Sequence, residues 1–357
     1  MSVLLPPAMA GTLPALERDW KQLQRKAGAI NPFLSWEWQN AWAETMDYPA
    51  LVIAQPFPDG SLAGVLALQR RRRRGLVQWE FLGQGSGGDE LDCLLHPDAP
   101  PETAARLLQT AMRQPHWHLL RLESADASGA LARSWPPERV ERDEWLPTLA
   151  LPESFDVLLA RHSANFRSEV RRRRRRFAEK FPQAHLESIS TPAAITGALQ
   201  HLFRLHNLRR AQKSGSGIFE SARLRAFHLR AAPALAHQGV ARLYCLRSAD
   251  AVLAVLYGFE AGPRGTRRFL YFQSGFDSAI TAFSPGTVLL SAVIEDCMAR
   301  GLQRFDFLRG TESYKARWTS DGHASLRLLA SHGFAGTVWM GLRAHRQRWQ
   351  QQRKMAA

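Results

Sequence analysis

The chain has 357 residues, 45% of them hydrophobic and 10% aromatic, and this composition predicts a globular protein with a sizeable core and about two domains. Its formal net charge of +15 usually indicates a polyanionic partner. Sixteen positive charges, however, fall in three segments, residues 70–74, 171–176 and 343–354, so the rest of the chain is close to neutral. The charge therefore belongs to local features, which excludes a protein whose whole surface coats DNA.

The cysteine pattern and the apolar segments bear on the compartment. Cys93, Cys245 and Cys297 are too far apart for a zinc-binding C-x-x-C pair and odd in number for a disulfide framework, which favours a reducing compartment. The N-terminus lacks the basic region of a signal peptide, and the apolar run at 251–259 is far shorter than the ~20 residues of a membrane span. We expect a cytoplasmic protein with no transmembrane segment and no bound metal.

An internal repeat predicts the architecture. Residues 62–85 consist of two apolar segments joined by a basic turn, and residues 251–275 follow the same plan, with Leu66 in the place of Leu256 and Phe81 in that of Tyr271. A helical segment and one more strand follow each hairpin, at 101–124 and at 285–310. This order predicts an α/β (α+β) fold with two tandem units, each a mixed twisted sheet flanked by helices.

The domain limits follow from composition. The stretch 126–145 is rich in Pro, Ser and charge, which is typical of a boundary. We therefore predict an N-terminal domain at 1–145, a C-terminal domain at 146–335 and a basic helical tail at 336–357.

The six consecutive arginines at 171–176 lie in a predicted helix. Phe166, Val170 and Phe177 recur at helical spacing and give this helix an apolar face. Positions 173 and 174 continue that face. At least one of Arg173 and Arg174 is therefore expected to lay its alkyl stem along the protein and to point its guanidinium into a cleft.

Four segments resemble a known family when they are taken in order. They are NPFLSWEWQNAWAE (31–44), FRSEVRRRRRRFAE (166–179), FQSGFDSAITAFSPGTVLL (272–290) and FDFLRGTESYKARW (305–318). Together they are similar to the CelD-type acyltransferases of the GNAT superfamily, a group associated with bacterial cellulose and exopolysaccharide production. The resemblance covers about residues 30–320. It implies two GNAT-like domains in tandem and a relationship to the Fem peptidyltransferases, which use aminoacyl-tRNA.

A helix start after residue 284 is the predicted site for the acyl carrier. The first turn of a helix offers unpaired N–H groups and the positive end of the helix dipole to a pyrophosphate. The resemblance implies that coenzyme A binds here and along the preceding strand, with these candidate residues: Gln273, Ser274, Ser284, Pro285, Gly286 and Thr287. A Ser-capped helix and a polar strand end explain the same residues. The first repeat has acidic residues at this point, so we expect it to bind no acyl carrier.

The turn after the strand at 305–307 is the predicted catalytic segment. Asp306 or Glu312 is a candidate general base, and Tyr314 is a candidate acid for the departing thiolate. The resemblance implies that Lys315 stabilises the developing oxyanion. A salt-bridge cluster above a buried tryptophan explains the same pattern. The candidates for acceptor binding are Arg173, Arg174, His206, Arg309 and Trp318.

Three functions remain open from the sequence. The first is transfer from acetyl-CoA, or another acyl-CoA, to a sugar, nucleotide sugar or other cell-envelope precursor by direct attack on the thioester. The second is Fem-like transfer from aminoacyl-tRNA, in which the arginines would contact RNA phosphates. The third is binding of a polyanion, either a nucleic acid or a membrane surface, without catalysis. No motif for sequence-specific DNA recognition accompanies the arginines.

Overall fold

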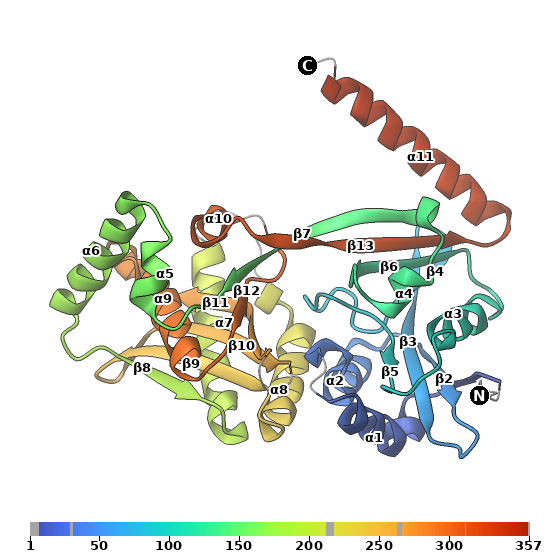
Figure 1. Cartoon of the computed structure of the whole chain (residues 1–357), viewed down its shortest axis with the longest axis horizontal. Helices are drawn as coiled ribbons and strands as arrows, with labels where there is room; N and C mark the ends of the chain where they lie inside the picture. The colour runs from blue at the N-terminus through green and yellow to red at the C-terminus, as the bar shows by residue number, and fades with distance from the viewer. Residues whose placement is uncertain (1–6, 29–30, 212–217, 263–265, 311, 356–357) are drawn as a thin grey trace. The chain divides into compact units, whose positions relative to one another are not determined.

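The computed structural model describes residues 7–28, 31–211, 218–262, 266–310 and 312–355 (Figure 1). The chain forms two compact units, each assembled from separate parts of the sequence. The first unit contains Met1–Ala27, Asp47–Asp143 and Ser325–Ala357, and the second contains Gly28–Met46 and Glu144–Ala324. From the sequence, residues 28–46 were predicted in the first domain and residues 325–335 in the second. In the structure, residues 28–46 belong to the second unit and residues 325–335 to the first.

The first unit has a mixed sheet in the order β1-β2-β3-β4-β6-β13, with β5 paired to β3. Neighbouring strands are antiparallel except β4 and β6. The strands are β1 (Met9–Gly11), β2 (Ala50–Pro56), β3 (Leu62–Arg73), β4 (Leu76–Phe81), β5 (Leu94–Leu95), β6 (Leu119–Ala125) and β13 (Gly322–Ser331). The helices are η1 (Pro14–Leu16), α1 (Glu17–Ala27), α3 (Thr103–Met112), α4 (Ala130–Arg133), η3 (Pro137–Arg139) and α11 (Gly333–Met355).

The second unit has a sheet in the order β7-β12-β11-β10-β9-β8, antiparallel except for β11 and β12. The strands are β7 (Val140–Ala150), β8 (His185–Ile189), β9 (Ala241–Ser248), β10 (Ala251–Ala261), β11 (Arg268–Phe276) and β12 (Arg304–Asp306). The helices are η2 (Pro32–Leu34), α2 (Trp36–Met46), α5 (Phe155–Ala160), α6 (Ala164–Lys180), α7 (Pro192–Ala211), η4 (Ile218–Glu220), α8 (Ala222–His237), η5 (Ser278–Phe283), α9 (Pro285–Ala299) and α10 (Ser313–Trp318).

The internal repeat predicted from the sequence is confirmed. In the first unit the hairpin β3–β4 is followed by α3 and by β6, which pairs parallel to β4. In the second unit β10–β11 is followed by α9 and by β12, which pairs parallel to β11. The basic turn of the first hairpin has φ of 51° at Arg74 and 80° at Gly75, so a two-residue turn with both residues in the left-handed region joins the strands.

An aromatic cluster explains why residues 28–46 belong to the second unit. Trp38 of α2 is fully buried, and its indole contacts the rings of Phe227 and Phe259 at centroid distances of 4.7 and 5.5 Å. Asn31 caps η2 by accepting a hydrogen bond from the Phe33 N–H, and the Phe33 ring joins the same cluster. The segment NPFLSWEWQNAWAE is thus a core element of this unit. None of the described helices combines the length and the apolar character that crossing a membrane requires.

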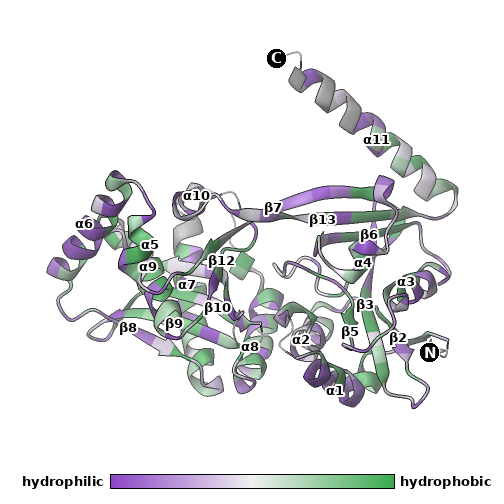
Figure 2. Cartoon of the chain, in the orientation of Figure 1, coloured by the Kyte–Doolittle hydropathy of each residue, from purple (hydrophilic) through white to green (hydrophobic). Residues whose placement is uncertain are grey.

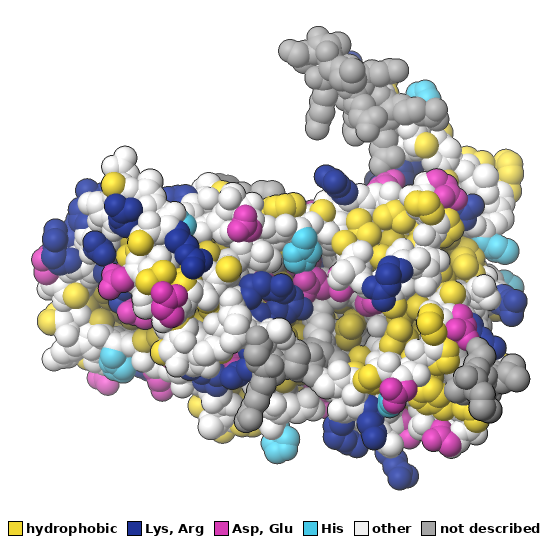
Figure 3. All heavy atoms as spheres, viewed as in Figure 1, with side chains coloured by type: hydrophobic (Ala, Val, Ile, Leu, Met, Phe, Trp, Pro, Cys, Tyr) yellow, Lys and Arg dark blue, Asp and Glu magenta, His cyan; other side chains and the backbone are white. Residues whose placement is uncertain are grey.

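The arginine helix α6 has the amphipathic character expected from its sequence. Its side chains Phe166, Val170 and Phe177 are buried, and Ser163 caps its first turn by accepting a hydrogen bond from the Phe166 N–H at 3.3 Å. Arg173 and Arg174 are partly buried, and the other four arginines of the run are exposed. Figure 2 shows the hydrophilic residues along α6, and Figure 3 shows Lys and Arg side chains gathered on its outer face.

Candidate active site

The site lies where two parallel strands separate. β11 pairs with β12 over three residues only, from Arg268 opposite Arg304 to Leu270 opposite Asp306. β12 ends there, whereas β11 continues to Phe276. On its other side β11 carries a bulge at Phe272, because Tyr257 pairs with Gln273 and Gly258 pairs with Tyr271. The strands therefore leave a gap beside residues 271–276 of β11.

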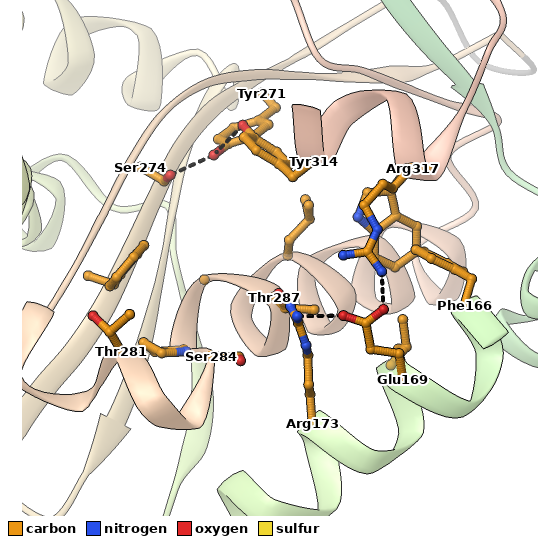
Figure 4. Close-up of a pocket in the computed structure, with 16 residues that line it drawn as sticks. Phe166, Glu169, Arg173, Tyr271, Ser274, Thr281, Ser284, Thr287, Tyr314 and Arg317 are labelled. Carbon is orange, nitrogen blue, oxygen red and sulfur yellow. Dashed lines mark hydrogen bonds and ion pairs between the residues drawn. The ribbon is translucent and has the colours of Figure 1, made fainter. Parts of the chain in front are cut away.

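A cavity of about 390 Å³ opens beside this gap (Figure 4). Its wall combines β11, the first turn of α9, one face of α6 and α10. Eight of the residues predicted for the site line it: Arg173, Ser274, Ser284, Pro285, Gly286, Thr287, Tyr314 and Trp318. The predicted carrier site and part of the predicted catalytic turn thus share one space.

The start of α9 forms one end of this cavity. Ser284 has a left-handed backbone with φ of 54°, and its side chain does not cap the helix. Its carbonyl accepts hydrogen bonds from the N–H groups of Thr287 and Val288 at 3.0 and 3.2 Å. A methyl group on Gly286 would lie 3.2 Å from the Phe276 ring, so glycine keeps the first turn of the helix close to β11. The residues that suggested an ordinary serine cap instead begin the helix without a side-chain cap and line a cavity.

Arg173 is the one arginine of the run that reaches the larger cavity. Its Nη1 donates a hydrogen bond to Thr287 Oγ1 at 2.9 Å, and its guanidinium pairs with Glu169. Glu169 also pairs with Arg317 of α10, and the hydrogen bond from Arg317 is the main cause of a lowered pKa of the Glu169 carboxyl. Figure 4 shows this group of charges beside the first turn of α9. Two cations and one anion leave the wall with a net positive charge.

Arg174 points elsewhere. Its guanidinium pairs with Glu295 at 2.7 Å and lies over the Phe155 ring, 5.2 Å from the centroid. It lines neither of the two cavities described at this site. The sequence left both arginines as candidates, and the structure brings only Arg173 to the site.

A smaller cavity of about 130 Å³ adjoins the first and shares Tyr271, Ser274 and Tyr314 with it. At this junction three hydroxyl groups form a chain. Tyr314 donates to the Tyr271 hydroxyl at 3.2 Å, and the Tyr271 hydroxyl lies 2.5 Å from Ser274 Oγ. The other predicted residues that line the smaller cavity are His206, Gln273, Arg309, Glu312 and Lys315. A proton can move along hydroxyl groups at these distances, from one cavity to the other.

Lys315 is tied to the loop that precedes α10. Its side chain is 6% exposed, and Nζ donates to the Arg309 carbonyl at 2.6 Å and pairs with Glu312 at 3.1 Å. The loop has left-handed backbone at Leu308, with φ of 53°, and at Gly310, with φ of 128°. A lysine that holds such a loop shapes the smaller cavity and places one positive charge in its wall.

Asp306 lies outside both cavities. It is buried, and its carboxylate pairs with Arg268 at 2.9 Å and with Arg304 at 2.8 Å. Two ion pairs hold the carboxylate at the point where β11 and β12 meet. This arrangement suits a structural carboxylate that joins the two strands, because no substrate in either cavity would contact it.

The equivalent gap in the first unit is filled by the protein itself. β4 and β6 pair parallel at Gln78 with Leu119 and at Trp79 with Leu120. Beyond these pairs, the Gln84 side chain bridges the strands, because its Oε1 accepts from the Phe81 N–H at 3.3 Å and from the Glu123 N–H at 3.1 Å. An amide side chain thus takes the place that a ligand would need.

The comparisons with known proteins agree with this geometry. Residues 164–316 match the family model described as an acetyltransferase (GNAT) domain. These residues form a GNAT acetyltransferase domain. The chain therefore carries the catalytic fold of an acyl-transfer enzyme. The matched segment includes α6, β11, α9 and the first part of α10, which contribute to the wall of the larger cavity.

Solved structures share the fold over most of the chain. The crystal structure of FemX has a TM-score of 0.58 at 12% identity, covering 90% of this chain and 96% of that one. The structure of L-PGS from Bacillus licheniformis has a TM-score of 0.55 at 11% identity, covering 91% and 96%. A conserved protein of unknown function from Bacteroides thetaiotaomicron has a TM-score of 0.55 at 12% identity, covering 92% and 100%. A search of curated proteins gave no match.

Eight of the residues that line the larger cavity were not predicted as site residues from the sequence, and Glu169, Tyr271 and Arg317 are among them. Glu169 lies four residues before Arg173 on the same helix, so helical spacing could have pointed to it. Tyr271 is an aromatic residue within a strand, and no sequence pattern distinguished it from the aromatic residues of the core. Among the described residues, no cluster of His, Cys, Asp or Glu has the arrangement of a metal site.

Proposed function

We propose that the chain transfers an acyl group, most simply acetyl, from coenzyme A to an acceptor that enters through the smaller cavity. The observation that supports this most directly is the pair of adjoining cavities, which share the hydroxyl chain of Tyr271, Ser274 and Tyr314. One cavity ends at a helix start and an arginine, which suits a pyrophosphate. The other is lined by polar and charged groups, which suits a hydrophilic acceptor.

The residues of the larger cavity fit the carrier. In the proposal, the first turn of α9 and Arg173 bind the phosphates, and Gly286 lets them approach the backbone. The pantetheine arm then follows β11 past Leu270, which is the last residue of β11 that pairs with β12. A backbone N–H of this part of β11 donates a hydrogen bond to the thioester carbonyl, and this bond strengthens as negative charge develops on the oxygen.

The reaction is a direct attack. The acceptor nitrogen or oxygen forms a bond to the carbonyl carbon, the carbon–sulfur bond breaks, and the electron pair leaves with sulfur. Tyr314 supplies a proton to the thiolate and recovers one through Tyr271 and Ser274. Glu312, which lines the smaller cavity, accepts the proton of the nucleophile. Asp306 takes no part, because its two arginine partners hold it away from both cavities.

The acceptor in this proposal is a sugar, a nucleotide sugar or another precursor of the cell envelope or of exopolysaccharide, as the CelD-type resemblance implies. His206, Arg309 and Lys315 in the smaller cavity can donate to hydroxyl or phosphate oxygens of such a molecule. We place the reaction in the cytoplasm, where coenzyme A thioesters and nucleotide sugars occur. The three cysteines are buried and free, which agrees with a reducing compartment.

Calorimetry with acetyl-CoA is the direct test. We expect one molecule of acetyl-CoA to bind per chain, with competition from coenzyme A. The fold likeness to FemX makes transfer from aminoacyl-tRNA the alternative, and it predicts no saturable binding of acetyl-CoA. A polyanion-binding protein without catalysis predicts the same absence, together with affinity for RNA that falls steeply with salt. Either result would overturn the proposed use of acyl-CoA.

A further inference from the structure

The C-terminal helix α11 carries an exposed apolar stripe. Phe334, Val338, Leu342 and Trp349 are 87%, 43%, 65% and 49% exposed. At ~100° per residue, these four positions fall within an arc of about 80°. Large apolar side chains that gather on one exposed helix face indicate a surface that binds something.

The stripe faces away from the helix's own unit. A Cβ on Gly336 would lie 2.2 Å from the His118 carbonyl, and the Arg343 guanidinium pairs with Glu141 at 2.5 Å. Positions 336 and 343 lie about 150° around the helix from the centre of the stripe at ~100° per residue. α11 thus rests on its unit through one face and presents the apolar stripe on the opposite one.

The charge of α11 has one sign. Residues 333–357 contain five cations, Arg343, Arg346, Arg348, Arg353 and Lys354, and no Asp or Glu. Positions 346 and 353 border the stripe on one side, as the helical period places them. Arg353 lies over the Trp349 ring, 4.0 Å from the centroid. A cationic rim along an apolar stripe complements a surface that is apolar inside and anionic at its edge.

We infer that α11 docks on an anionic lipid membrane, lying in the plane of the headgroups. Trp and Phe enter the boundary between headgroups and acyl chains, while arginines contact lipid phosphates. A second copy of α11 is a poorer partner, because pairing two stripes would bring Arg346 and Arg353 of one copy close to the same arginines of the other. A nucleic acid would use the arginines and leave the stripe in water. This inference concerns a surface of the first unit and does not depend on the acyl-transfer reaction.

Flotation with vesicles tests the inference on the full chain. We expect the protein to float with vesicles of phosphatidylcholine and phosphatidylglycerol and not with phosphatidylcholine alone, with tryptophan fluorescence shifting to shorter wavelength. Leu342→Ser should weaken binding by about 30-fold, since it removes one apolar side chain from the stripe. Arg346→Gln with Arg353→Gln should weaken it by about 25-fold, at about 5-fold for each charge.

The matched control is Leu208→Ser. Leu208 lies on α7 in the second unit and is 47% exposed, so the change alters the same chemistry outside the stripe. It should leave binding unchanged, and circular dichroism should show both serine variants folded. The inference is overturned if the parent protein does not bind anionic vesicles, or if the two serine variants bind equally. A dimer that Leu342→Ser converts to a monomer, or RNA binding in place of vesicle binding, would also overturn it.

Discussion

Replacing Arg173 with glutamine tests the placement of the acyl carrier. The change removes a positive charge from the cavity wall next to Thr287 and leaves a shorter, neutral polar side chain. A hydrogen bond between charged groups contributes about 1.5–3 kcal/mol, so we expect acetyl-CoA affinity to fall by about 10- to 150-fold. Glu169 keeps Arg317 as a partner, and stability should change by less than about 1 kcal/mol.

Calorimetry of single Arg→Gln variants through residues 171–176 is the assay. The matched control is Arg175→Gln, because the Arg175 side chain is 70% exposed and pairs with Glu179 of its own helix at 3.7 Å. We expect this control to change acetyl-CoA affinity by less than about twofold. Arg174→Gln should also preserve affinity, since its partner Glu295 lies outside the cavities. If all six variants lose acetyl-CoA affinity to a similar degree, and if each loss is larger at low salt, the reasoning is refuted. That result would indicate a helix that binds polyanions through its total charge.

Four further changes probe the site and the core. Gly286→Glu should abolish acetyl-CoA binding, because it adds a carboxylate where the phosphates meet α9, whereas Pro101→Glu, just before α3, should leave calorimetric affinity unchanged. Tyr314→Phe should lower kcat more than it lowers acetyl-CoA affinity, since its proton is needed only as the thiolate leaves; equal kcat in an acceptor assay would remove this role. Trp38→Ala should lower the free energy of unfolding by about 3–5 kcal/mol in urea titrations, and a loss below about 1 kcal/mol would contradict its place in the core. Burial lowers the pKa of His228 to about 3, so between pH 6.5 and about 3 the unfolded chain binds a proton that the folded chain excludes. The free energy of unfolding should therefore decrease as the pH is lowered through this window, by up to about 1.4 kcal/mol per pH unit from this residue. In His228→Phe, the urea midpoint should depend less on pH over the same range.

Much of the fold could be predicted because its signals are local. Apolar segments around Leu66 and Leu256 predict the repeated hairpins. The spacing of Phe166, Val170 and Phe177 predicts the apolar face of α6. Local periodicity also reduced the arginines expected to point into a cleft from six to two. It could not separate Arg173 from Arg174, because the choice depends on Thr287 and Glu295, more than a hundred residues further along the chain.

The features that could not be predicted depend on contacts that only the folded chain shows. Alternation put Asp306 on the face opposite Phe305 and Phe307, but its role depends on Arg268 in the neighbouring strand. Lys315 stood in a crowded turn, and only the folded loop shows its bond to the Arg309 carbonyl. No sequence pattern indicated a role for Gln84, because its role is to bridge two strands of the folded sheet.

The grouping of segments into units constrains how this chain can fold during synthesis. Moving along the sequence, the chain changes unit after Ala27, Met46, Asp143 and Ala324. A ribosome that has made the first half of the chain has therefore completed neither unit, because β6 still lacks β13 and the Trp38 cluster still lacks α8 and β10. The usual order for tandem proteins, in which the N-terminal domain folds first, is therefore excluded, because the first unit is completed only after the second. Fragments cut near residue 145 would each expose part of an apolar core, so a chaperone would meet both units at the same late stage of translation.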